Sequence, residues 1–346
     1  MTMRQTILGL VAIISYLLPL SFASAHEVYV LDPDTIRAAM ATTSPNTFLA
    51  YFGNELRFFF WAFVSFVVVT TIFFATLFGL FERSLGPIFS YLRRFAVPLA
   101  RITTGISLFS FGLAGELYGT ELPFYQLFGS YGSAAAELAF LALGIFLIVG
   151  FQTRAVAVAA VAIYAYAFAV YGWYVLTYTD HLGAYLLLLI LGGGAWSLDS
   201  NPHIHKLRVF DLRALTPFAF PILRILFGLG IMFASVYAKY VHSELALQVV
   251  VQYNLTAYFP FDPLFVVLGA LIIEFLAGLM LVLGVAIRWT SLFLLFWLTL
   301  SLLYFQEAVW PHIILFGLGL AIFLQGYDRL SIETMWMKKY HRKPVM

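Results

Sequence analysis

The sequence predicts an all-α fold: a polytopic integral membrane bundle with two parallel four-helix repeats. Three observations support this prediction. Hydrophobic residues make up 62% of the 346 residues and charged residues only 10%, and the mean hydropathy is +0.93, which exceeds what a soluble domain can bury. The apolar residues fall into separate stretches of about 20, the length that crosses a bilayer core. Landmarks of the first half of these stretches recur in the second half.

The first 25 residues have the pattern of a secretory signal peptide. Arg4 supplies the positive start, residues 7–22 are the apolar core, and the Ala-Ser-Ala at 23–25 fits the small-residue cleavage site. Cleavage would make His26 the mature N-terminus, whose free amine and ring could chelate copper as a metal ligand. An uncleaved first helix is the alternative. A short outer segment, residues 26–56, follows.

Nine apolar stretches after the signal peptide are long enough to cross a membrane as helices. The first, residues 57–81, is an extra helix outside the repeats. The other eight have expected bounds of 98–117, 133–151, 155–176, 181–197, 217–240, 264–285, 288–304 and 310–326. The resulting division is repeat 1 at 95–199, a polar and basic linker at 200–216, repeat 2 at 217–333 and a basic tail at 334–346.

The two repeats carry the same landmarks in the same order. Each opens with a proline, an arginine and a glycine, has a glycine-to-arginine turn in the middle, and places a histidine at the start of its last helix and an aspartate after it. The matched pairs are Pro98 and Pro221, Arg101 and Arg224, Gly105 and Gly228, Gly150 and Gly284, Arg154 and Arg288, His181 and His312, and Asp199 and Asp328. Four spans return the chain to its starting side, so both repeats run in one direction. A site is expected at their seam.

The charged residues predict an orientation. Of the 19 Lys and Arg residues, Arg4 is in the signal peptide, Arg37, Arg57 and Lys239 lie in outer segments, and the other 15 fall on the inner side. This distribution follows the positive-inside rule. The expected location is the cytoplasmic (inner) membrane of a prokaryote, with the mature N-terminus outside and the C-terminus inside.

Several kinds of chemistry are excluded by composition. The chain has no cysteine, so it forms no disulfide, no thiolate-bound iron–sulfur cluster and no covalent c-type haem. It has no Walker motif and no Rossmann glycine motif between a strand and a helix, and we expect no nucleic-acid partner. The partner that composition does imply is the lipid bilayer.

Glu274 is the strongest candidate for a functional residue. It lies about ten residues into a span, near mid-membrane, where an ionisable group has to be paired, face a cavity or stay protonated. It is either a proton-carrying or ligand-binding carboxyl, or a protonated structural link between helices. Arg224, about 10 Å from the inner boundary, is expected to pair with Glu274 or to bind an anionic headgroup. Glu137 is the counterpart in repeat 1, although the turn-based alignment matches Glu274 with Phe140.

His181 and His312 begin the last helix of each repeat at the outer face. A two-fold-related histidine pair is the minimum for a non-covalent b-type haem, and the nearby Asp180 and Glu307 would suit part of a metal site. The alternative, which is more common, is that both are amphipathic residues at the membrane interface. Tyr and Trp gather at the same outer ends, as in an interfacial belt, and would also suit the flat ring of a quinone.

These motifs resemble the DoxX/DoxD-like family of membrane proteins over about residues 95–333. Repeat 1 ends in three glycines at 192–194 and Ser-Leu-Asp at 197–199, similar to that family's closing run. Repeat 2 has the Arg224-to-Lys239 opening helix, then Glu274-Phe-Leu-Ala-Gly and the turn to Arg288. In two places the pattern is broken: Glu116 stands where the counterpart of Lys239 would be, and the closing run of repeat 2 is Gly-Tyr-Asp-Arg-Leu-Ser at 326–331.

The resemblance implies the membrane subunit of a quinone-linked oxidoreductase system, because some members are the membrane part of thiosulfate:quinone oxidoreductase. A soluble or periplasmic redox partner would then be expected, with Glu274 and Arg224 handling the proton of quinone reduction. Two other functions stay open. One is a transporter or channel for a small solute along the seam. The other is a non-catalytic scaffold that holds a periplasmic partner through residues 26–56 and the outer loop 239–263.

Overall fold

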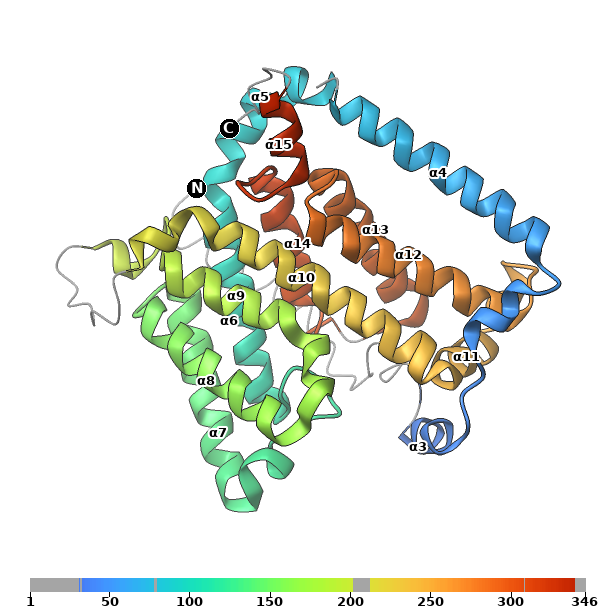
Figure 1. Ribbon diagram of the computed structural model, residues 1–346. Coiled ribbons are helices and arrows are strands. Elements are labelled where there is room, and N and C mark those ends of the chain that lie inside the picture. The colour runs from blue at the N-terminus through green and yellow to red at the C-terminus, as the bar shows by residue number, and fades with distance from the viewer. Residues whose placement is uncertain (1–30, 32, 78–79, 202–211, 308, 340–346) are drawn as a thin grey trace.

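The computed structural model of the chain describes residues 31, 33–77, 80–201, 212–307 and 309–339. Within these ranges the chain is helical and forms no β-strand, which confirms the predicted all-α class (Figure 1). The expected signal peptide, the candidate metal ligand His26 and most of the linker lie outside the described residues.

Seven helical segments of the described chain are long and apolar enough to cross a membrane, so lipid contact is the environment that this fold requires. The long helices are α4 (Glu55–Leu77), α6 (Ala96–Ala114), α7 (Phe124–Val149), α8 (Thr153–Tyr171), α10 (Ala219–Val236), α12 (Pro263–Leu283) and α13 (Ile287–Phe305). The remaining elements are α3 (Pro33–Ala41), η1 (Thr47–Tyr51), α5 (Leu80–Leu92), η2 (Arg93–Phe95), η3 (Gly172–Tyr178), α9 (Thr179–Leu191), η4 (Leu198–Ser200), η5 (Arg213–Phe218), the π-helix η6 (Tyr237–Val241), α11 (Ser243–Gln252), η7 (Leu255–Ala257), α14 (Ile313–Gln325) and α15 (Ile332–Lys339).

The last helix of each expected repeat is shorter than predicted. Helices α9 and α14 have 13 residues each, about 20 Å at 1.5 Å per residue. Each ends at a glycine with positive φ, Gly192 at +75° and Gly326 at +68°, a conformation that stops an α-helix. Helix α9 belongs to one continuous apolar helical segment, Thr153–Leu191, which also includes α8 and η3.

Eight helices form the bundle and contact one another in two sets of the same internal order. In the first set, α6 packs on α7, α7 contacts α8, and α8 packs on α9; in the second, α10, α12, α13 and α14 follow the same scheme. Between the sets, α9 lies along α10 and α14 lies along α6. A single hydrophobic core runs through both sets, from Ala96 to Tyr327.

Pairs of glycines bring the first two helices of each set into backbone contact. A Cβ atom on Gly228 of α10 would lie 2.6 Å from the carbonyl oxygen of Gly278 in α12, and a Cβ on Gly105 of α6 would lie 2.9 Å from that of Gly144 in α7. Small residues at helix crossings allow this close approach in membranes, where packing drives association.

Helix α4 stands apart from the bundle. In Figure 1 it runs along one edge of the molecule, and none of the residues of its membrane-spanning window is buried. Only its first turn packs on the bundle, where Phe58 joins Phe265 and Leu268 of α12. The outer segment is attached more firmly, because α3 packs on α11 and η1 packs on α12. Part of the loop 239–263, including Leu245 and Val249, is therefore covered by residues of its own chain.

The glycine contact between α10 and α12 predicts a position-specific loss of stability. Gly228→Ala should lower the free energy of unfolding by about 1–3 kcal/mol, because the added methyl group has to push two backbones apart. Gly269→Ala is the matched control. Gly269 lies on α12, and a Cβ atom added there would have no neighbouring atom within 4 Å. Unfolding in mixed micelles measures both, and equal effects would contradict the close contact.

Candidate functional site

Glu274 forms an ion pair inside the bundle. The Lys239 ammonium nitrogen lies 2.9 Å from Oε2 of Glu274, and the indole N–H of Trp297 donates to Oε1 at 3.2 Å. These side chains come from α12, from η6 at the end of α10, and from α13. The Glu274 side chain is 19% exposed and that of Lys239 is 9% exposed. The carboxyl is therefore paired, as an ionisable group among membrane-spanning helices has to be.

The π-helix η6 places Lys239. Here the N–H of His242 donates to the carbonyl of Tyr237, five residues back, at 2.9 Å, and the hydroxyl of Thr47 in η1 donates to the carbonyl of Lys239 at 2.6 Å. A single π-turn shifts the side chains that follow it relative to an α-helix. Such turns are frequent at functional sites.

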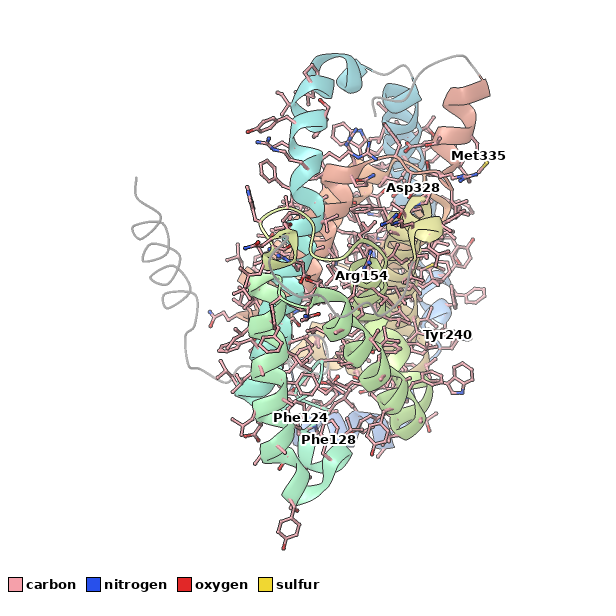
Figure 2. All side chains as sticks on the ribbon, turned by 90° about the vertical axis from the view of Figure 1, so that its left-hand side faces the viewer. Phe124, Phe128, Arg154, Tyr240, Asp328 and Met335 are labelled. Carbon is pink, nitrogen blue, oxygen red and sulfur yellow. The ribbon has the colours of Figure 1, made fainter. Side chains whose placement is uncertain are left out.

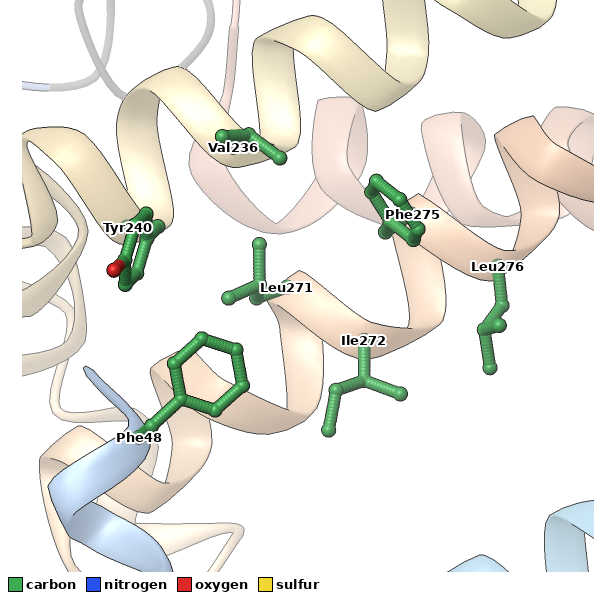
Figure 3. A pocket seen from close by; sticks show the side chains of 7 residues that line it. All are labelled: Phe48, Val236, Tyr240, Leu271, Ile272, Phe275 and Leu276. Atoms are coloured by element: carbon green, nitrogen blue, oxygen red, sulfur yellow. The ribbon is translucent and has the colours of Figure 1, made fainter.

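An open apolar groove of about 410 Å³ is formed by the same elements, although neither Lys239 nor Glu274 is among the residues that line it. Its walls come from η1, from α10 with η6, and from α12 (Figure 3). The lining residues are Phe48, Val236, Tyr240, Leu271, Ile272, Phe275 and Leu276. Tyr240 directly follows Lys239 in the chain, and Phe275 directly follows Glu274. These elements therefore hold a charged pair, aromatic side chains and an apolar groove.

Arg224 does not pair with Glu274, so that part of the expected site is wrong. Its guanidinium binds Asp328 through two contacts, Nε to Oδ2 at 2.6 Å and Nη2 to Oδ1 at 3.2 Å, and donates to the carbonyls of Leu281 and Val282. Arg224 lies near the start of α10, about 20 Å from Lys239 along the helix axis. It is only 1% exposed, so a bilayer headgroup does not reach it either.

Glu137 occupies a different setting from Glu274. It lies on α7, half-buried, with Oε1 close to Gly115. Among the described residues its carboxylate has no ion pair and no hydrogen bond. The residue that matches Glu274 from the turn, Phe140, is buried in the core. The first set therefore lacks the charged pair of the second.

The side chains of His181 and His312 lie within the bundle. Both are 2% exposed. Nδ1 of His181 lies 3.1 Å from Oδ2 of Asp180, and Nε2 of His312 lies 3.2 Å from Oε2 of Glu307. A carboxylate partner for one ring nitrogen offsets part of the cost of burying each ring.

The histidines do not fit a haem. Each is held by its own carboxylate, and the ring of His181 is enclosed by Phe111, Tyr118 and Tyr178 at centroid distances of 4.7–5.9 Å, which leaves no open face for a porphyrin. Across the described ranges, no group of three or more His, Asp and Glu side chains is arranged to hold a metal ion. Neither a haem nor a metal ion is assigned to these histidines.

The turn between the second and third helices is capped by a carboxylate in both sets. Asp199 accepts from the backbone N–H groups of Gln152 and Thr153 at 2.8 and 2.9 Å. In the second set Glu333 accepts from Ala286 and Ile287 at 2.7 and 3.5 Å. Asp199 thus corresponds to Glu333, and Asp328 has no carboxylate counterpart in the first set.

Two residues of these sites carry no sequence signal that predicts their role. Trp297 is one of seven tryptophans in apolar sequence, and only the packing of α13 on α12 brings it to Glu274. Glu333 is the last residue of the expected repeat 2, after the last span, and nothing in its sequence context indicates a capping role. Lys239 did carry a signal, because it is a cation at the end of an apolar stretch.

Comparison with known proteins adds no assignment. No protein-family profile matches the sequence, and no curated protein and no solved structure matches it. The resemblance to the DoxX/DoxD-like family therefore stays a prediction from the motifs named above. Function has to be inferred from the geometry.

The Arg224–Asp328 pair predicts a large loss of stability when its charge is removed. Asp328→Asn leaves a buried guanidinium without its counter-charge, and we expect the free energy of unfolding to fall by about 3–5 kcal/mol. Asp262→Asn is the control, because this exposed residue caps α12 by accepting from Leu264 and asparagine caps equally well. A loss below about 1 kcal/mol in Asp328→Asn would contradict the buried pair.

Glu116, in the loop between α6 and α7, predicts a pH dependence. Burial, with a smaller contribution from the charge of Glu121, raises its pKa from 4.5 to about 7. The folded protein thus binds this proton more tightly than the unfolded chain, so the stability from this group is complete below about pH 4.5 and is lost as pH rises through 7. Glu116→Gln should therefore gain Tm over the parent between pH 5 and pH 8. A Tm difference that is constant over this range would contradict the shift.

Proposed function

We propose that the chain is an integral membrane protein made of two parallel four-helix repeats, α6–α9 and α10–α14, related by an axis along the membrane normal, with α4 as an extra span. The shared contact order, the matching glycine contacts and the matching turns support this. The short α9 and α14 complete the nine spans if each is extended by the segment before it. The DoxX-like motifs lie within these repeats.

The proposed location is the inner membrane of a prokaryote, with residue 26 outside and the C-terminus inside. The distribution of Lys and Arg supports it. In Figure 2, Asp328 lies toward the opposite end of the molecule from Phe124 and Phe128, and Arg154 lies between them. The arginine-rich turns would face the cytoplasm, and the loop with Glu116 would face outward.

We propose that the chain serves as the membrane subunit of a quinone-linked oxidoreductase system. The observation that carries this is the Lys239–Glu274 pair beside the apolar groove. A quinone has two carbonyl acceptors on a flat ring and a long apolar tail. The Lys239 ammonium is a suitable donor to one carbonyl oxygen, aromatic residues are suitable contacts for the ring, and the groove suits the tail.

The proposed role of Glu274 is to hold a proton for the reduced quinone oxygen. In the resting pair its carboxylate is stabilised by Lys239 and Trp297. A proton taken up by Glu274 frees the ammonium to donate elsewhere, so the pair couples proton position to hydrogen bonding at the groove. In this proposal the two electrons come from a soluble or periplasmic redox partner.

A scaffold function is the second candidate, and the geometry of α4 favours it. This helix presents a long apolar surface that its own bundle does not cover, including Phe63 and Phe66. A membrane partner could pack there. Solute transport has less support, because the carboxylate of Glu274 is already paired with Lys239 and is not free to line a solute path.

Quinone binding tests the proposal. The double variant Lys239→Met/Glu274→Gln removes the pair without leaving an uncompensated charge, and it should weaken binding of a short-chain quinone analogue in nanodiscs about tenfold, since a charge-assisted hydrogen bond is lost. Glu137→Gln, a half-buried carboxyl on α7 with no cation beside it, is the matched control. Absence of binding by the parent protein, or an equal loss in both variants, would refute the quinone site. A stable complex with a soluble enzyme that tolerates the double variant would favour the scaffold.

A further inference from the structure

The two arginine-rich turns differ in charge, although their backbones correspond. The second contains Arg224 and Arg288 together with two carboxylates, Asp328 and Glu333. The first, which we call the first turn site, contains Arg101, Thr153, Arg154 and Asp199, and so has two guanidinium groups but one carboxylate. That carboxylate is already engaged by two backbone N–H groups. Within the described residues the first turn site is thus one negative charge short of its counterpart.

Buried donors at the first turn site have no acceptor. Arg101 is 1% exposed and uses one nitrogen, Nη2, to donate to the carbonyl of Trp196 at 3.0 Å; its Nε and Nη1 have no partner among the described residues. The same holds for Nε of Arg154 and the hydroxyl of Thr153. Leaving charged donors buried and unpaired is costly. Four unsatisfied donor atoms at one turn indicate an acceptor that the chain does not supply.

The segment 192–196 covers these donors. Gly192, Gly194 and Trp196 all have positive φ, so this segment is not helical. A Cβ on Gly193 would lie 2.8 Å from the Thr153 hydroxyl, and one on Gly192 would lie 3.7 Å from Nε of Arg154. In the second set the equivalent stretch carries Asp328 to its arginine. In the first set, glycine stands at the equivalent position, 194.

We infer that the first turn site binds a phosphate group, which takes the place that the Asp328 carboxylate has beside Arg224. A phosphate offers several acceptor oxygens, and arginine forks match its geometry in pairs of hydrogen bonds. Its charge makes up the deficit at Arg101 and Arg154. Entry requires segment 192–196 to shift, which its glycines allow. The phosphate belongs either to an anionic lipid headgroup or to a free ion, and the site lies at the opposite end of the helices from the Lys239–Glu274 pair.

The test uses the full chain, delipidated in detergent or reconstituted in nanodiscs, with Tm as the readout. Inorganic phosphate should raise Tm in a saturable way if a free ion is bound, whereas phosphatidylglycerol nanodiscs should exceed phosphatidylcholine nanodiscs if a headgroup is bound. Arg154→Gln and Thr153→Val each remove one unpaired donor while leaving Arg101 in the core. They should weaken the apparent affinity for the effective probe about tenfold.

Arg329→Gln is the matched control, because Arg329 is an exposed arginine at the same end of the second set and should leave the affinity unchanged. A Tm that neither probe raises would overturn the inference. So would a rise that equal ionic strength of chloride reproduces, or one that both site variants retain in full.

Discussion

A charge buried in this bundle needs a hydrogen-bonding partner, because hydrocarbon offers none and water reaches only the ends. This constraint explains the arrangement of the polar side chains. Arg224 lies between a carboxylate and two carbonyls, Glu274 between an ammonium and an indole, and both buried histidines lie against carboxylates. The contacts of Arg224 and Glu274 join elements that are distant in sequence, so they also help to fix which helices are neighbours.

Backbone contact at the glycines makes this pairing possible. Where α10 crosses α12 at Gly228 and Gly278, the helices are close enough for Arg224 to reach carbonyls at the end of α12. Toward the other end of α10, Lys239 pairs with Glu274 of α12, and apolar side chains of both helices line the groove. The same two helices thus carry a closed arginine contact at one end of α10 and the ion pair at the other.

The sequence predicted the helices well because apolar length and the glycine-to-arginine turns are local signals. It failed where a partner depends on crossing geometry. Arg224 and Glu274 were expected to pair because both are charged in adjacent spans, yet their positions along the helices differ by several turns. Asp199 and Asp328 follow the last helix of each set and were matched for that reason, yet Asp199 takes the role of Glu333. The lengths of α9 and α14 were overestimated, because apolar residues are found on both sides of the glycines that end these helices.

The differences between the two sets are more informative than their likeness. Where the backbones of the two sets correspond, a side chain present in one set and absent from the other marks a place where the sets differ chemically. The second set keeps a complete polar turn and the Lys239–Glu274 pair. The first set replaces Glu274 by the core residue Phe140 and Asp328 by Gly194, so it has an apolar mid-membrane and an unbalanced arginine turn. The Lys239–Glu274 pair and the groove thus lie on the second set, while the turn of the first set holds arginine nitrogens that are buried and unsatisfied.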